Sequence, residues 1–525
     1  MSFISWQYLL FLPLIFLLYW LLSGRKRLLL LLAASYVFYG CWDVRFLALV
    51  LATTVIDFLC GLSIDGKRTP PLQALLLALA PAAWLGVCRL FLPAAGLAPG
   101  VLGLAAGLGL LFFGAHEALW TWGGERRRRY FLILSVGFCL TILGFFKYFG
   151  FFVESARTLL TAAGLQPGPV LLKIILPVGI SFYTFQSLGY VFDIYRGTAS
   201  ACRDFITFAV FDAFFPQLVS GPIERGHQLI PQLEADRGFQ PAYLQDGLSL
   251  MLVGFFKKVF VADNCAVLAN YAFAPGADLN GDWAILGVVA FAFQIYGDFS
   301  GYTDIARGSA RLLGIDLVEN FRFPYLARNP SDFWSRWHIS LSNWFRDYLY
   351  IPLGGNRSGR WQTLRNLGVT MLLAGLWHGA SWIFVLWGAY HGALLIAYHF
   401  PPLNLLAGKE ERFSWRTLIA LPLMWLLILV GWAIFRSADL PQLWAWCAAL
   451  GHWQTSLALP WRSSCGWLLI HTVPLILLQL LTLKYRQETG LRHLSWPVKG
   501  LVYVLLVLLV VSSSEQDREF IYFQF

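Results

Sequence analysis

The chain has 525 residues, of which 58% are hydrophobic and only 13% are charged, and its formal net charge is +10 at pH 7. Many apolar runs reach the length of about 20 residues that a helix needs to cross a bilayer, and they are continuous, which argues against a membrane barrel. The positive charge lies in short loops and not in a separate basic domain, so nucleic-acid binding is not expected. Composition therefore predicts an all-α, polytopic membrane protein, with residues 1–525 forming a single integral domain.

The first part of the chain, about residues 1–165, is predicted to be a scaffold of ordinary membrane spans. The apolar run at residues 3–22 has no positive residue ahead of it and a basic cluster at 25–27 behind it, so we expect a retained helix rather than a cleaved signal peptide. Further basic clusters at 67–68 and 126–129 follow the third and fifth spans. Basic loops favour the cytoplasm, so the N-terminus is predicted to lie outside.

From about residue 170 the apolar runs become shorter, and proline, glycine and polar residues interrupt them. The clearest interruptions are residues 177–186, 215–223 and 296–304. Irregular backbone at membrane depth is tolerated only where protein or a cavity satisfies the freed amide groups. Residues 170–395 are therefore predicted to be the functional core, with broken or re-entrant helices.

Residues 410–512 are predicted to add further spans, and residues 513–525 to form a tail. Basic residues precede the last apolar run and mainly acidic residues follow it, which places the C-terminus outside. The eight cysteines show no metal-like spacing and are interpreted as small core residues, so no metal site is predicted. No internal repeat is evident, which argues against an inverted-repeat transporter.

A polar, aromatic-rich stretch at residues 332–356 stands out in this apolar chain. Large apolar residues recur in it at three- and four-residue spacing, which predicts one face of a helix with His338 beside it. They are Trp334, Trp337, Leu341, Phe345 and Tyr348. Pro352 should end this helix. Ionisable groups at membrane depth are costly, so Arg336, His338, Arg346, Asp347 and His378 are expected inside the protein or against a cavity.

His338 and His378 are the candidate catalytic residues. Each one alone is better explained as a hydrogen-bonded core histidine than as a catalyst. Two of them in one polar core favour proton transfer, for which a neutral imidazole is suited near pH 7. Gly379 would let another backbone or a substrate approach His378, and His391 is a weaker candidate. Metal ligation by these two histidines lacks a third ligand, and no serine-nucleophile motif accompanies them.

Four motifs together resemble the membrane-bound O-acyltransferase (MBOAT) family, in the bacterial branch of the alginate O-acetylation membrane subunit. They are residues 336–342 (Arg-Trp-His-Ile-Ser-Leu-Ser), 346–351 (Arg-Asp-Tyr-Leu-Tyr-Ile), 354–357 (Gly-Gly-Asn-Arg) and 376–380 (Leu-Trp-His-Gly-Ala). Weaker matches extend the resemblance over about residues 130–395, whereas residues 70–125 hold an additional pair of spans. The resemblance implies a helical fold with broken helices around a central channel.

The resemblance also implies an activity and a location. In this branch a cytoplasmic acyl thioester, commonly acetyl-CoA, is the donor substrate, no cofactor is bound permanently, and the acyl group passes outward through the bacterial inner membrane. An SGNH-type partner outside then completes the transfer to a cell-surface polysaccharide or wall polymer. His378 corresponds to the family's near-invariant histidine and His338 to the second active-site residue. Thioester transfer needs a base and donors for the developing oxyanion, so we assign His378 as the base and His338 as its orienter or as an oxyanion donor.

Two further assignments leave alternatives open. Arg336, Arg346, Asn356 and Arg357 could contact the donor's phosphates, but positive-inside anchoring explains them equally well. The aromatic tail at residues 518–525 could be an interfacial anchor. Its resemblance to the Phe-Ile-Tyr-Phe motif of the small partner peptide in D-alanylation systems implies instead that Tyr522 receives the acyl group.

Two other functions compete with O-acetylation of a polymer. A transporter or channel for a polymer or lipid precursor would need repeats and charges at the membrane midplane, and the sequence shows neither. An MBOAT enzyme that acylates a lipid or a protein would carry the same histidines. The bacterial form of the motif at residues 336–342 favours a polysaccharide or wall polymer, which the sequence does not name.

Overall fold

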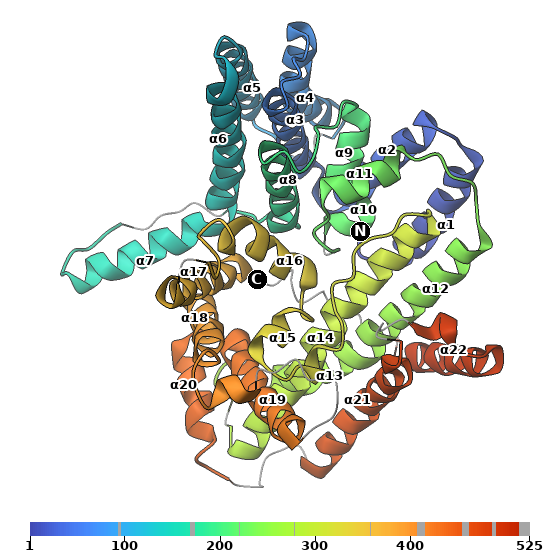
Figure 1. Ribbon diagram of the computed structural model, residues 1–525, viewed down its shortest axis with the longest axis vertical. Coiled ribbons are helices and arrows are strands. Elements are labelled where there is room, and N and C mark those ends of the chain that lie inside the picture. The colour runs from blue at the N-terminus through green and yellow to red at the C-terminus, as the bar shows by residue number, and fades with distance from the viewer. Residues whose placement is uncertain are drawn as a thin grey trace. The chain divides into compact units, whose positions relative to one another are not determined.

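The computed structural model describes residues 1–92, 96–168, 174–219, 221–277, 279–357, 359–406, 415–453, 461–485 and 490–513. All regular secondary structure in these ranges is helical (Figure 1). Seven helical segments within them are long and apolar enough to cross a membrane. The prediction of an all-α, polytopic membrane protein is confirmed.

The chain divides into two compact units, which are described separately. The first unit holds residues 1–244 and 309–317, and the second holds residues 245–308 and 318–525. The helices of the first unit are α1 (Trp6–Leu21), α2 (Arg25–Asp43), α3 (Leu47–Ile64), α4 (Pro71–Phe91), α5 (Pro99–Trp120), α6 (Gly124–Leu143), α7 (Phe149–Ala162), α8 (Ile180–Tyr195), α9 (Phe205–Ala213), α10 (Phe215–Leu218) and α11 (Gly226–Glu234). A π-helical turn, Gly144–Tyr148, joins α6 to α7, whose exposed residues include Phe152, Leu159 and Leu160 as well as Glu154.

The three basic clusters of the first unit lie at the same end of it. Arg25 pairs with Asp204 at 3.6 Å, Lys67 donates to the carbonyl of Ala201, and Arg68 pairs with Glu117 at 3.1 Å. Because residues 201 and 204 are close in sequence, the first two contacts bring the loops after α1 and α3 together, and the third joins α5 to them. The cluster at 126–129 lies beside them, because Arg68 and Arg127 both lie over the ring of Trp120. This arrangement is what alternating crossings by α1 to α5 require.

The second unit begins within α12 and includes α13 to α22, except for the last residues of α14, which belong to the first unit. Their bounds are α12 (Pro241–Phe255), α13 (Asp263–Ala272), α14 (Gly281–Leu312), α15 (Pro330–Trp334), α16 (Ile339–Phe345), α17 (Arg360–His378), α18 (Trp382–Ala397), α19 (Trp415–Arg436), α20 (Leu440–Ala449), α21 (Trp461–Leu483) and α22 (Trp496–Val511). Two π-helical turns, η4 (Phe256–Ala262) and η6 (Arg346–Tyr350), follow α12 and α16. Proline or an N-capping residue begins several of these helices. For example, Asn329 accepts a hydrogen bond from the Asp332 amide at the start of α15.

The central polar stretch is not the single helix that its periodicity predicts. α15 ends at Trp334, and His338 has the left-handed backbone conformation, with φ +43°, before α16 begins. The reason lies in a distant segment: the Arg322 amide donates to the Arg336 carbonyl, and the Ile339 amide donates to the Asn320 carbonyl, both at 2.9 Å. These bonds replace the intrahelical bonds that a continuous helix would make, so the prediction of one helical face is wrong.

α17 and α18 form a hairpin in which glycines allow backbone contact (Figure 1). A Cβ atom on Gly388 of α18 would lie 2.4 Å from the Met371 carbonyl oxygen, and one on Gly375 of α17 would lie 2.3 Å from the Phe384 carbonyl oxygen. Small residues at such positions let membrane helices pack closely. The hairpin fixes the end of α17, which carries His378.

Gly388→Ala is expected to lower the apparent thermal unfolding temperature in detergent by several degrees. The Met371 carbonyl that the new Cβ atom would meet cannot move without separating the two helices, and overpacking of this kind costs about 1–3 kcal/mol. Gly368→Ala is the matched control, because a Cβ atom there would meet nothing closer than 3.8 Å. Equal unfolding temperatures for the two variants would contradict the close packing.

Candidate active site

His338 is fully buried and has a defined hydrogen-bond partner. Its Nδ1 lies 3.1 Å from Asn320 Oδ1, which also accepts hydrogen bonds from the amide and hydroxyl of Ser340. An atom that accepts from a backbone N–H is the amide oxygen, so Nδ1 of the neutral His338 must be the donor. Its Nε2 is then the basic nitrogen. The left-handed backbone of His338 is costly for a non-glycine residue, and this network stabilises it.

His378 is the last residue of α17 and is 4% exposed. Its ring meets the rings of Trp377, Trp387 and Phe435 edge to face, at centroid distances of 5.1, 4.9 and 5.5 Å. A Cβ atom on Gly379 would lie 2.2 Å from the Phe384 ring, so the glycine makes room for this aromatic ring rather than for a backbone or a substrate. The imidazole is thereby held in an apolar frame.

The two histidines share one neighbour. The ring of Trp377 lies 5.8 Å from that of His338 and 5.1 Å from that of His378, measured between centroids. Phe299 of α14 meets His338 on another side, with ring planes at 90° and centroids 4.7 Å apart. α14, α16 and α17 therefore all contribute to the position of this pair, whose segments lie 40 residues apart in the chain.

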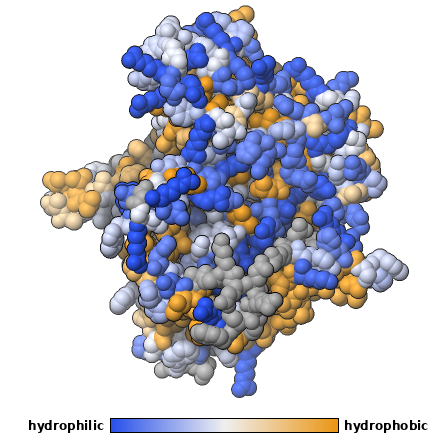
Figure 2. All heavy atoms as spheres, viewed as in Figure 1, coloured by the Kyte–Doolittle hydropathy of each residue, from blue (hydrophilic) through white to orange (hydrophobic). Residues whose placement is uncertain are grey.

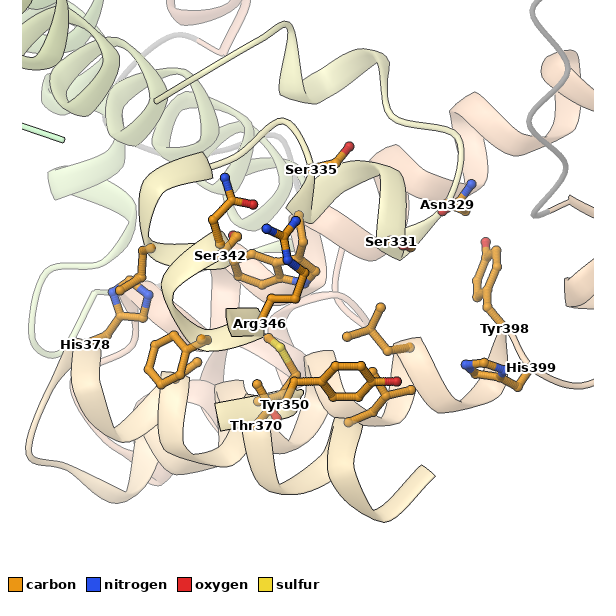
Figure 3. Close-up of a pocket in the computed structure, with 18 residues that line it drawn as sticks. Asn329, Ser331, Ser335, Ser342, Arg346, Tyr350, Thr370, His378, Tyr398 and His399 are labelled. Carbon is orange, nitrogen blue, oxygen red and sulfur yellow. The ribbon is translucent and has the colours of Figure 1, made fainter. Parts of the chain in front are cut away.

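A pocket of about 570 Å³ reaches His378 (Figure 3). In Figure 3, His378 lies at one end of the pocket and Tyr398 and His399 lie at the other. On α17 the lining runs from Leu367 to His378, about 16 Å at roughly 1.5 Å per residue. Other polar lining residues are Asn329, Ser331, Ser335, Ser342, Asn343, Arg346, Tyr350 and Thr370, and apolar ones include Leu341, Phe345, Met371 and Ala374. His338 is not among them, but its helix α16 supplies one wall.

The predicted basic contacts separate into two groups. Arg346 lines the pocket with its side chain 57% exposed, and its Nε donates to Asp347 at 2.8 Å. Arg336 pairs with Asp332 at 2.6 Å away from the lining, and Asn356 and Arg357 are exposed in the turn before α17. Only Arg346 of the four thus reaches the pocket. Arg346 is expected from the sequence either inside the protein or against a cavity, and it lies against a cavity.

Buried charges near this site escaped the sequence analysis. Lys257 and Lys258 of η4 are each 1% exposed. Lys257 pairs with Asp304 at 2.9 Å, and Lys258 pairs with Asp263 and Asp298 at 2.7 and 2.8 Å. Asp298 and Asp304 belong to α14, which is long and apolar enough to cross a membrane. The sequence analysis did not identify these buried charges, in which each lysine is compensated by carboxylates of another helix.

Comparisons with known proteins identify the family. The model of the membrane-bound O-acyltransferase family matches residues 200–436, which include His338 and His378. The chain is 39% identical over 456 residues to the probable alginate O-acetylase AlgI of Pseudomonas putida, covering 85% of this chain and 80% of that protein. It is 30% identical over 461 residues to the peptidoglycan O-acetyltransferase of Helicobacter pylori, covering 82% and 76%.

A more distant relative is named for a different activity. The teichoic acid D-alanyltransferase of Bacillus subtilis is 29% identical over 278 residues, which cover 50% of this chain and 68% of that protein. The resemblance seen in the motifs is thus confirmed by matches over most of the chain. The chain belongs to the membrane-bound O-acyltransferase family, in the type represented by the alginate O-acetylases, and it is a multi-pass membrane O-acyltransferase.

Proposed function

We propose that this enzyme takes an acetyl group from cytoplasmic acetyl-CoA and passes it across the bacterial inner membrane for O-acetylation of a cell-surface polysaccharide or wall polymer. The observation that carries the proposal is the elongated pocket that ends at the buried His378. A thioester at the tip of the long pantetheine arm of CoA needs a pocket of this form. Arg346, on the wall, is the cationic side chain suited to a phosphate of the donor.

The transfer uses His378 as the proton carrier. An acceptor hydroxyl oxygen attacks the thioester carbonyl carbon, the new C–O bond forms, and the C–S bond breaks. The hydroxyl proton passes to His378 and then to the departing thiolate of CoA, so charge and protons balance. The apolar rings around His378 limit water, which would otherwise hydrolyse the thioester.

His338 is assigned to position His378 or to assist its proton transfer. With its Nδ1 donating to Asn320, its Nε2 can accept a proton but cannot donate one while the ring is neutral. A role as oxyanion donor therefore requires His338 to be protonated, whereas a role as second proton carrier does not. This tautomer favours proton transfer by His338 over the oxyanion role that the sequence analysis also allowed.

Sidedness follows from charge. The clusters at residues 25–27, 67–68 and 126–129 lie at one end of the first unit, and the positive-inside rule assigns that end to the cytoplasm and the N-terminus to the outside. Acceptors outside the cell fit this orientation. The named activities of the relatives on alginate and peptidoglycan support a polymer acceptor, with an SGNH-type partner completing the transfer.

Tyr522 lies outside the described residues and is proposed as the covalent relay. Its phenol would receive the acetyl group as an aryl ester, which is activated enough to pass the group on to the partner, so that CoA need not cross the membrane. Tyr522→Phe is expected to abolish polymer acetylation in cells. An aromatic interfacial anchor would instead tolerate phenylalanine, so full acetylation by this variant would contradict the relay.

Mass spectrometry tests the donor and the relay directly. Purified protein incubated with isotopically labelled acetyl-CoA should carry one labelled acetyl group on the C-terminal peptide, at Tyr522. Phe520→Leu is the matched control, because it alters the aromatic tail without removing a hydroxyl. Release of CoA without acetylation of the tail would refute the relay while leaving the acyltransferase proposal intact.

A further inference from the structure

Helix α6 follows a short turn after α5, and its first turns contain four consecutive arginines, residues 126–129. Two of them are engaged within the first unit. Arg127 lies over the Trp120 ring, with its guanidinium carbon 4.5 Å from the centroid. Arg128 pairs with Glu125 at 3.0 Å and donates to the Tyr195 carbonyl at 2.6 Å.

The other two arginines face a surface pocket. Arg126 and Arg129 are three residues apart on α6, so they lie on one face of the helix. Together with Trp122, Tyr130 and Ile133 they line a pocket of about 690 Å³. Within the described part of the chain neither arginine pairs with a carboxylate. The pocket therefore offers two uncompensated guanidinium groups.

The rest of this pocket is apolar and exposed. Trp122 and Tyr130 meet edge to face with centroids 4.6 Å apart, and these residues are 42% and 41% exposed. Ile133 is 52% exposed. α5 and α6 both belong to candidate membrane spans, so their connecting turn lies at the bilayer surface. Hydrophilic side chains gather at this end of the two helices (Figure 2). Tryptophan and tyrosine prefer this depth.

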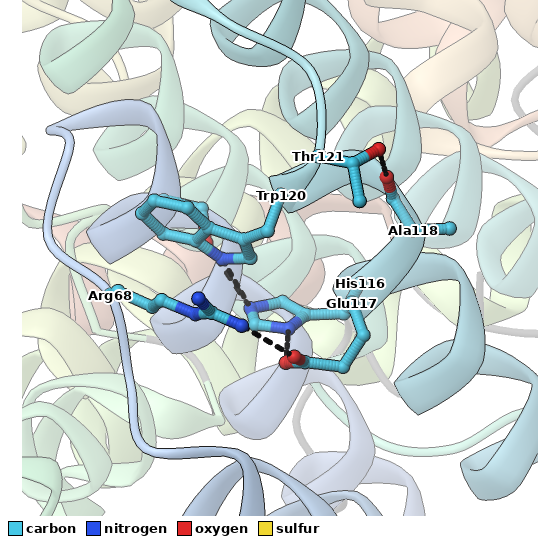
Figure 4. A network of polar contacts seen from close by, with 7 residues as sticks. Arg68, His116, Glu117, Ala118, Trp120 and Thr121 are labelled. Carbon is cyan, nitrogen blue, oxygen red and sulfur yellow. Dashed lines mark hydrogen bonds and ion pairs between the residues drawn. The ribbon is translucent and has the colours of Figure 1, made fainter.

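A polar network around the buried His116 joins the end of α5 to the loop after α3 (Figure 4). Trp120 donates to Nε2 of the fully buried His116 at 3.4 Å, which leaves Nδ1 of His116 to donate to Glu117 at 3.1 Å. Arg68, from the loop after α3, also donates to Glu117. This network fixes the ring of Trp120, on which Arg127 packs, and thereby holds the start of α6 in position.

We propose that this pocket binds the headgroup of an anionic phospholipid. Arg126 and Arg129 would hold the phosphate by charge-assisted hydrogen bonds, and the acyl chains would lie along Tyr130 and Ile133. A ligand with both a negative head and an apolar tail matches both halves of the pocket. A soluble phosphate would leave the aromatic half in contact with water. The site is separate from the acyl-transfer pocket and does not depend on the proposed function.

Native mass spectrometry of the full-length protein in neutral detergent, titrated with phosphatidylglycerol or phosphatidylcholine, tests this site. Arg126→Gln/Arg129→Gln is expected to weaken phosphatidylglycerol binding at least fivefold and to leave phosphatidylcholine binding unchanged. The matched control is Lys26→Gln/Arg203→Gln, which removes the same charge from exposed positions elsewhere in the first unit. This control should bind like the unaltered protein.

Three results would overturn the proposal. Unchanged phosphatidylglycerol binding in the pocket variant would exclude the site, and an equal loss in the control would indicate a diffuse charge effect. Competition by inorganic phosphate at concentrations equal to the lipid would assign a soluble anion instead. Trp122→Ala distinguishes a lipid headgroup from a soluble phosphate as the ligand, since it should weaken lipid binding and leave phosphate binding unchanged.

Discussion

His378→Gln is expected to lower acyl transfer by about 100-fold or more, the range typical for removal of a general base. Glutamine keeps a polar side chain of similar reach at the end of the pocket, but it cannot take a proton from the acceptor hydroxyl. The loss should appear in kcat, with little change in KM for acetyl-CoA, because the imidazole acts on the reacting atoms and not on the arm of the donor. Measuring CoA release and acetyl transfer by purified protein in liposomes checks both constants.

Two controls make this result interpretable. His452→Gln changes an exposed histidine that does not line the pocket and should retain full activity. The apparent unfolding temperature of His378→Gln reports whether the aromatic frame of Trp377, Trp387 and Phe435 survives the substitution. Near-normal transfer by a folded His378→Gln protein would remove this residue from the chemistry.

The sequence predicts the helical class and the burial of both histidines because these follow from strong local rules. A bilayer requires long apolar helices, and an ionisable group such as His378 in an apolar run must lie inside the protein. The basic clusters predict which loops share one end for the same reason. None of these inferences requires knowledge of which segments are neighbours.

The features that the sequence does not reveal depend on contacts between distant segments. His338 interrupts the expected helix because backbone groups of residues 320 and 322 form hydrogen bonds with those of residues 339 and 336. The apolar periodicity within residues 332–348 cannot predict these contacts with another segment. The same limit hides Asn320, whose amide oxygen sets the tautomer of His338. It also hides the far end of the pocket, where Tyr398 and His399 directly follow α18, the second helix of a hairpin.

The buried lysines show this limit most clearly. Lys257 and Lys258 have no role in the sequence analysis, yet both side chains are 1% exposed and form ion pairs within the second unit. Their partners Asp298 and Asp304 lie about 40 residues later, on α14. α12, η4 and α14 also approach closely at glycines: a Cβ atom on Gly301 would lie 2.7 Å from the Gly254 carbonyl oxygen. The ion pairs therefore link two backbones that are already in contact.

Lys258→Met is expected to destabilise the protein by about 3–5 kcal/mol, because it leaves the buried carboxylates of Asp263 and Asp298 without their shared cation. Acyl transfer should fall as well, since Phe299, which follows Asp298, packs on His338 and would shift with α14.

Two further variants serve as controls. Lys258→Met/Asp298→Asn should recover part of the lost stability by removing one of the two uncompensated charges. Lys26→Met, at an exposed site, should change neither stability nor acyl transfer. Apparent unfolding temperatures in detergent and initial transfer rates measure both effects. An unchanged unfolding temperature for Lys258→Met would mean that water or another cation compensates these carboxylates, and that the lysine does not hold α14 against the active site.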